Sequence, residues 1–377
     1  MTPRARAAVG YSSTARHQLM QRRDLLRLPA LGLASVAALS GPAAVAAPPL
    51  IGVRFALPNK AIEPLGANYL IPGQLGYYRQ VGLDASFIPL GSVAAAVAAL
   101  ADHRADFAAL PASDVLELAA HGGLPDIVAF YEMTYPFKYD IAVDPASPIH
   151  SIAQLRGKTI GVANFGTSEY PVGRALLRRA GINPTRDVHW LAVGEGVIGG
   201  VALQHHRIDA FIYWDTGFGQ IEAAGIPLRF LPLGTPPDVG GIFLFTSAAL
   251  LRQRPAVATG VGKAVAETSL FIQTNPRAGA YAFIKAFPSA APKVASLQKQ
   301  VDALAVPIRW RMPLYRSKDP ALTKWGEMSA QEWRATAAFL HLPRIGDPGK
   351  YFTNALIPGI NAFDAAAVVA AARHAPQ

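Results

Sequence analysis

The sequence predicts an α/β fold built from two successive, doubly wound lobes. Three observations lead to this prediction. Short apolar or β-branched runs alternate with longer segments of helical apolar spacing, which is typical of parallel strands connected by helices. This alternation breaks near residues 135–137 and starts again at residue 139. The chain has 377 residues, 51% of them hydrophobic, so it is long enough to bury two such cores.

The first lobe is predicted to follow a βαβαβαβ order, which favours a mostly parallel sheet covered by helices on both faces. Ser92 precedes an alanine-rich helix predicted over residues 93–104, and a second helix is predicted from Pro111–Ser113 to Gly122-Gly123. Residues 66–79 have helical spacing that Pro72-Gly73 interrupts. The predicted strands are residues 51–57, 85–90, 106–110 and 126–133.

The same rhythm predicts the second lobe. Its strands are expected at residues 139–143, 159–163, 188–193, 209–213 and 228–233, with helices after residue 168 and over residues 197–207 and 216–224. An apolar run at residues 241–245 then predicts a strand that returns to the first lobe. Helices are predicted over residues 255–273 and 276–286. From residue 289 the pattern is helical and irregular, with Trp310, Trp325 and Trp333 as expected packing anchors.

Residues 155–174 are the first candidate for a binding site. A short strand, Thr159–Ala163, leads into the turn Asn164–Ser168, and a helix follows. A unit of this kind places free backbone N–H groups beside a crevice at the carboxyl end of a parallel sheet. The alternative is an ordinary βα turn in which Thr167 or Ser168 only caps the helix.

The composition excludes several classes of chemistry. Because the chain has no cysteine, it forms no disulfide, no thiolate nucleophile and no iron–sulfur cluster. Its nine histidines show neither HxxxH nor HExxH spacing, so we expect no metal and no cofactor. The sequence has no GxSxG, no P-loop and no dinucleotide-binding glycine motif, so we expect no enzyme. A pair of carboxylates in a cleft is the remaining catalytic alternative.

The first 46 residues are predicted to be an export signal. Arg22-Arg23 precede an uncharged apolar stretch that ends in the small residues Ala44–Ala46. This order is similar to the twin-arginine type, although Gln21 and Leu25 depart from its usual pattern, so Sec export stays open. Translation from Met20 and an uncleaved membrane anchor are further alternatives. Without residues 1–46, 29 basic and 24 acidic residues leave a net charge of +5, and we expect no nucleic-acid partner.

Several phrases, taken together in their order and spacing over residues 50–285, resemble one family. They resemble the periplasmic solute-binding proteins of ABC importers for nitrate, taurine, aliphatic sulfonates and thiamine-pyrimidine precursors. The phrases are Gly76–Asp84 with Pro89–Ser92, Ala105–Ala108, Gly122–Pro125, Ser147–Ile149, Leu155–Val162, and Arg207–Ala210 before Trp214-Asp215.

The resemblance implies a type II periplasmic binding protein fold in which a small solute is captured by hinge closure. It implies a periplasmic monomer that works with an inner-membrane permease and its ATPase; a periplasmic ligand sensor is the alternative. The two lobes would be joined by crossover segments at Met133–Lys138 and Leu233–Gly241. The expected domains are the export signal (1–46), lobe I (47–135 with 240–290), lobe II (136–239) and a C-terminal helical region packing on lobe I (291–377).

Ligand-binding residues are expected in loops at the carboxyl ends of the strands. The hydroxyls of Ser113, Thr167 and Ser168 either contact ligand or only cap their helices. Tyr135 and Trp214 either stack on a planar ligand or pack in the protein. The full set is Asn59, Ser113, Tyr135, Asn164, Gly166, Thr167, Ser168, Trp214 and Asp215.

Charges at the helix starts bear on the ligand. Helix N-termini favour anions, but each cleft-facing helix start carries its own carboxylate, namely Asp114, Glu169 or Asp215. Lys60 and Lys138 are the only nearby basic residues in the predicted loops. The sequence therefore favours a neutral or amine-bearing planar ligand, such as a pyrimidine. A sulfonate, taurine or nitrate ligand is the alternative.

Overall fold

The computed structural model describes residues 49–377 except 137, 235–237, 316–322 and 343–344. The predicted export signal lies outside the described residues. In the part of the chain that is described, no helix combines the length and apolar character needed to cross a membrane.

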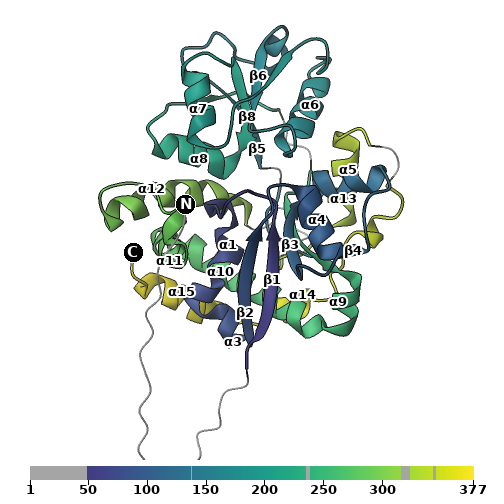
Figure 1. The fold of residues 1–377 in the computed structure, drawn as a ribbon, viewed down its shortest axis with the longest axis vertical. Coiled ribbons are helices and arrows are strands. Elements are labelled where there is room, and N and C mark those ends of the chain that lie inside the picture. The colour runs from purple at the N-terminus through teal and green to yellow at the C-terminus, as the bar shows by residue number, and fades with distance from the viewer. Residues whose placement is uncertain (1–48, 137, 235–237, 316–322, 343–344) are drawn as a thin grey trace, which may run out of the picture. The chain divides into compact units, whose positions relative to one another are not determined.

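The first of two five-stranded sheets has the strand order β2-β1-β3-β10-β4 (Figure 1). Strand β1 runs parallel to β2 and β3, whereas β10 is antiparallel to β3 and β4. The pairing of β10 confirms that the chain returns to the first sheet late in the sequence. The strands are β1 (Ile51–Leu57), β2 (Leu83–Pro89), β3 (Phe107–Pro111), β4 (Ile127–Glu132) and β10 (Ile242–Ser247).

The second sheet has the order β7-β6-β8-β5-β9. Strand β6 is parallel to β7 and β8, and β5 is antiparallel to β8 and β9. In both sheets the antiparallel strand is the one through which the chain arrives from the other sheet, so the two lobes share one topology. The strands are β5 (Tyr139–Val143), β6 (Thr159–Val162), β7 (His189–Ala192), β8 (Ala210–Trp214) and β9 (Arg229–Phe230).

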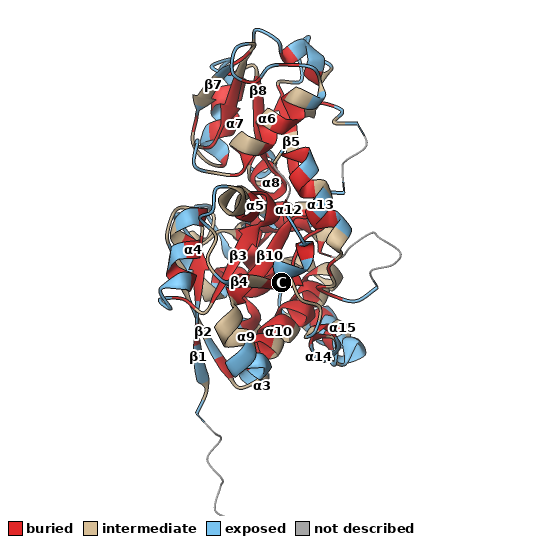
Figure 2. Ribbon diagram, turned by 90° about the vertical axis from the view of Figure 1, so that its right-hand side faces the viewer, coloured by how far each residue is buried: buried red, intermediate tan, exposed pale blue. Residues whose placement is uncertain are grey.

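Both faces of the first sheet are buried, as a doubly wound sheet requires. Phe55 of β1 packs in a core shared with α10 (Pro255–Thr274), and the next residue, Ala56, packs in a separate core with α4 (Val93–Ala101). Because successive strand side chains point to opposite faces, these two cores lie on opposite sides of the sheet. Figure 2 shows the central strands β3, β8 and β10 as buried.

The helices begin and end mostly where local chemistry predicts. Ser92 caps α4 by accepting a hydrogen bond of 3.1 Å from the backbone N–H of Ala95. The predicted helical stretch 66–79 is broken into α1 (Ala67–Leu70), α2 (Pro72–Leu75) and α3 (Tyr77–Gln80), because Pro72 starts a new helix and Gly76 takes a left-handed φ of 85°. The others up to residue 286 are α5 (Ala112–Ala120), α6 (Glu169–Arg179), α7 (Val197–Gln204), α8 (Asp215–Ala223), α9 (Ala248–Gln253) and α11 (Pro276–Ala286).

The C-terminal region is helical. The fully buried Trp333 lies against Phe243, Tyr351 and Phe352 beside the first sheet. The first helix of this region also contacts α8 of lobe II, which the sequence did not suggest. The helices are α12 (Leu297–Arg311), α13 (Ala330–Phe339), α14 (Ile357–Ile360) and α15 (Ala365–His374).

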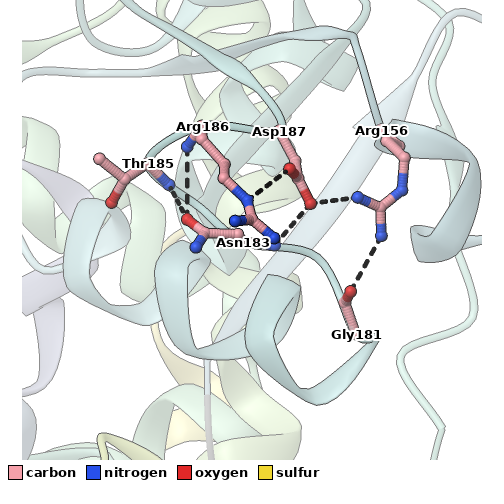
Figure 3. Close-up of polar contacts among 6 residues, drawn as sticks. All are labelled: Arg156, Gly181, Asn183, Thr185, Arg186 and Asp187. Atoms are coloured by element: carbon pink, nitrogen blue, oxygen red, sulfur yellow. Dashed lines mark hydrogen bonds and ion pairs between the residues drawn. The ribbon is translucent and has the colours of Figure 1, made fainter.

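A polar cluster holds the turn between α6 and β7 (Figure 3). The carboxylate of Asp187 accepts a hydrogen bond of 3.0 Å from the backbone N–H of Asn183 and forms ion pairs with Arg156 and Arg186. The Asn183 N–H, followed by these two guanidinium groups, holds the pKa of Asp187 below its usual value. These contacts fix the chain where it enters β7.

Candidate functional site

A cavity of about 40 Å³ lies between loops of the two lobes. Ligand sites for small organic molecules usually measure roughly 300–1,000 Å³, so this cavity is too small to admit such a molecule unless the lobes part. Most of its lining comes from the carboxyl ends of β1, β3, β6 and β8 and from the start of β5, and the rest comes from the start of β10 and from helical segments that follow β1 and β2. The lining residues are Pro58, Asn59, Leu65, Tyr69, Val93, Ala109, Pro111, Lys138, Tyr139, Gly166, Thr167, Ser168, Glu169, Trp214 and Ile242.

Five of the predicted site residues lie together on this lining, namely Asn59, Gly166, Thr167, Ser168 and Trp214. They come from both lobes, as the strand-end argument requires. The sequence prediction did not include Tyr69 and Tyr139, which also line the cavity. Tyr69 is in a short helix after β1 rather than in a strand-end loop, so the loop criterion passed over it.

Three other predicted residues are used inside the protein instead of lining the cavity. Ser113 donates a hydrogen bond of 2.9 Å to the carboxylate of Asp114. Tyr135 donates one of 3.2 Å to Asp238, and the side chain of Asn164 accepts one of 2.8 Å from the backbone N–H of Gly166. The Asn164 contact shapes the turn that presents Gly166 to the cavity.

Lys138 supplies the positive charge on the cavity lining. Its side chain is only 8% exposed, and its Nζ lies 4.8 Å from the ring centre of Tyr139 and 5.4 Å from that of Trp214. Such cation–π contacts stabilise a buried ammonium group. Burial, followed by repulsion from Arg311, lowers the pKa of Lys138 to about 8.

Glu169, in the first turn of α6, is the most unusual group on the lining. Its side chain is 1% exposed, and one carboxylate oxygen accepts a hydrogen bond of 2.6 Å from the hydroxyl of Thr167. The other oxygen, Oε2, is buried and has no hydrogen-bond partner among the described residues. Burial raises the pKa of Glu169 to about 7, against the lowering effect of Thr167, its own backbone N–H and Lys138. Buried acceptors are nearly always paired, so an unpaired one at a cavity indicates a place for a donor from a ligand.

Asp114, in the first turn of α5, connects the two lobes. Its Oδ2 accepts hydrogen bonds of 2.9 Å from Ser113 and of 2.5 Å from Ser168, the residue that precedes α6. Burial raises the pKa of Asp114, while the hydroxyls of Ser168 and Ser113 and the charge of Lys138 oppose that rise. The first turns of helices from both lobes therefore meet at one carboxylate. Neither here nor elsewhere in the described part of the chain do His, Asp and Glu side chains form a cluster suited to a metal ion.

Comparison with known proteins identifies the family. The family model described as NMT1/THI5 like matches residues 66–279. The chain belongs to the NMT1/THI5-like family. A search of the curated proteins finds no match.

Solved structures agree with the fold of this NMT1/THI5-like chain. It is similar to the periplasmic aliphatic sulphonate binding protein SsuA from Escherichia coli, with 19% identity over 81% of this chain and 97% of that one and a TM-score of 0.61. It is also similar to the alkanesulfonate-binding protein SsuA from Xanthomonas axonopodis pv. citri, bound to MOPS, with 17% identity over 81% and 99% of the two chains and a TM-score of 0.59. A protein from Bordetella bronchiseptica RB50 gives 20% identity over 82% and 96% and a TM-score of 0.61. The two-lobed fold implied by the resemblance to periplasmic solute-binding proteins is thereby confirmed.

A buried ion pair near the site involves Arg311, which lies outside residues 66–279, the range that the NMT1/THI5-like model matches. Arg311 of α12 is fully buried and donates two hydrogen bonds of 2.5 Å to the two oxygens of Asp215. Its remaining nitrogen donates one of 3.2 Å to the backbone oxygen of Leu65. Asp215, a predicted ligand contact, is thus paired with Arg311 and does not line the cavity. Its partner is 96 positions away, and no local pattern could have indicated it.

Proposed function

We propose that this NMT1/THI5-like chain is the extracytoplasmic substrate-binding subunit of an ABC importer and that its ligand is a small, planar, nitrogen-bearing organic solute. The family and the fold support the first part, and the free oxygen of Glu169 carries the second. A buried carboxylate oxygen without a partner is a strong acceptor for a ligand N–H group, because the alternative is an unpaired polar atom.

The charge of the cleft supports a ligand that is not an anion. Lys138 is the only cation on the described cavity lining, and Asp114 and Glu169 both lie close enough to act on its pKa. Arg311 offers no free charge, since both oxygens of Asp215 hold it. An anion would enter a site in which acidic groups outnumber basic ones.

The aromatic lining supports a flat ligand. Tyr69, Tyr139 and Trp214 line the same cavity as Glu169. Aromatic faces pack well against planar rings, while a single polar acceptor fixes the orientation of the ring. An aminopyrimidine has both the flat ring and the N–H donors.

The mechanism in this proposal is hinge closure without a chemical step. The solute enters when the lobes part, contacts Asn59 and Tyr69 of lobe I, and gains contacts to residues 166–169 and Trp214 as lobe II closes. These extra contacts stabilise the closed form. The closed form then delivers the solute to a permease and its ATPase at the inner membrane, with the subunit acting as a periplasmic monomer.

Thermal unfolding in the presence of candidate ligands tests this proposal. We expect an aminopyrimidine to raise Tm, because a ligand at about a hundred times its Kd adds about 2.7 kcal/mol to the stability of the folded state. Methanesulfonate, taurine and nitrate should give no comparable rise.

Two variants make the same experiment specific. Glu169→Gln should lose most of the aminopyrimidine-dependent rise, because its amide presents an N–H₂ group where the carboxylate accepts. Glu222→Gln changes an exposed glutamate of α8 and should keep the full rise. A rise with sulfonate or nitrate and none with aminopyrimidines would show that the ligand class is wrong.

A further inference from the structure

We infer that Asp114 determines the charge of the ligand, because its carboxylate occupies the position between the first turns of α5 and α6 that an anionic group of a ligand would otherwise take. The inference rests on the proposed function and names the residue that sets its specificity.

The position has the features that attract anions. Helices α5 and α6 have nine and eleven residues, long enough for their first turns to carry appreciable positive partial charge. Both first turns meet at the cleft, because Ser168 before α6 reaches Asp114 in α5 at 2.5 Å. Lys138 lines the same cavity as Ser168 and acts electrostatically on Asp114, which is not itself on the lining. Two helix starts, two serine hydroxyls and an ammonium group would form an anion site if no carboxylate were present.

Asp114 already uses these donors. Its carboxylate accepts hydrogen bonds from Ser113, from Ser168 and from its own backbone N–H. An incoming sulfonate or nitrate would have to replace the Asp114 carboxylate as the acceptor of these hydrogen bonds. It would then stand next to a like charge, and like-charge contacts are a means by which binding sites reject wrong partners.

Glu169, the other carboxylate of this cleft, differs from Asp114 in having one oxygen without a hydrogen-bond donor among the described residues. It accepts hydrogen bonds from Thr167 and from its own backbone N–H, yet its Oε2 stays buried without a partner among the described residues. The two carboxylates therefore have different roles. Asp114, which accepts three hydrogen bonds, keeps anions out, and Glu169, whose Oε2 is unpaired, accepts an N–H donor. This division predicts that removing the charge of Asp114 changes which ligands bind.

Calorimetric titration of methanesulfonate into the full-length protein tests this inference. We expect Asp114→Ser to bind methanesulfonate about tenfold or more tightly than the unaltered protein does, because the serine clears the position and leaves the hydroxyls and Lys138 facing the anion. Asp114→Asn keeps the size of the side chain and should show a gain in the same direction, which covers the case in which the serine variant does not fold. Asp102→Ser removes an exposed aspartate of the same lobe and should show no gain.

Equal methanesulfonate affinity in the unaltered protein and in both Asp114 variants would overturn the inference. Its failure is distinguishable from failure of the proposed function. If an aminopyrimidine binds the unaltered protein but neither variant gains sulfonate binding, only the role of Asp114 is wrong. If a variant gains sulfonate binding but no nitrogen compound binds the unaltered protein, the role of Asp114 stands and the proposed ligand class is wrong.

Discussion

Replacing Arg311 by methionine is expected to lower the free energy of unfolding by about 3–5 kcal/mol, because removal of one partner from a buried ion pair leaves an uncompensated charge. Arg311 is fully buried and donates two short hydrogen bonds to Asp215. Loss of the third contact, to the backbone of Leu65, adds to the effect. Urea unfolding followed by circular dichroism measures the change.

The matched control is Arg309→Met, an exposed position on the same helix, for which a change within about 0.5 kcal/mol is expected. The double variant Arg311→Met with Asp215→Asn should recover part of the loss, since it leaves neither charge buried alone. If Arg311→Met proves as stable as Arg309→Met, the buried pair of Arg311 and Asp215 does not contribute to stability as argued here.

Replacing Glu169 by glutamine is expected to stabilise the ligand-free protein at high pH and to leave it unchanged at low pH. The pKa of Glu169 is raised from 4.5 to about 7 by burial. A carboxyl group with a raised pKa in the folded state contributes stability that is complete below about pH 4.5 and is lost as the pH rises through about 7. Above that range the unaltered protein keeps a buried charge that the glutamine variant lacks, which is worth at most about 3 kcal/mol.

Urea unfolding of both proteins at about pH 4, 6 and 8 measures this difference. The advantage of Glu169→Gln should grow through this series, because glutamine still accepts the hydrogen bond from Thr167 but never ionises. An advantage that does not change with pH would mean that Glu169 titrates normally and is not desolvated at the cavity. The expected gain in stability with loss of binding is typical of a residue kept for function.

The fold could be predicted from the sequence because its signals are local. Apolar runs mark strands such as β8, and Ser92 caps α4 in place. The prediction failed where local signals were weak: the strand expected over residues 228–233 pairs only at Arg229–Phe230.

The candidate site could be predicted only in part, for a related reason. The topology indicates which loops lie at strand ends, and Ser168 and Trp214 from those loops line the cavity. Asp215 was placed correctly at a helix start, but its partner Arg311 is brought in by a distant helix. The sequence identifies Glu169 as an acid at a helix start, but its unpaired oxygen depends on burial in the folded protein, which no local pattern encodes.

The central claim, that two lobes close on a nitrogen-bearing solute, is tested most directly by a distance measurement between the lobes. Because the chain has no cysteine, Arg104→Cys in lobe I and Arg186→Cys in lobe II can be spin-labelled without background, and both side chains are more than half exposed. Pulsed electron–electron double resonance should show a broad distribution of distances between the two labels without ligand, and a narrower distribution at shorter distances with an aminopyrimidine. The aminopyrimidine should cause no such change in a protein that also carries Glu169→Gln. A distribution that stays the same with and without the aminopyrimidine, at concentrations that saturate binding, would contradict closure on the ligand.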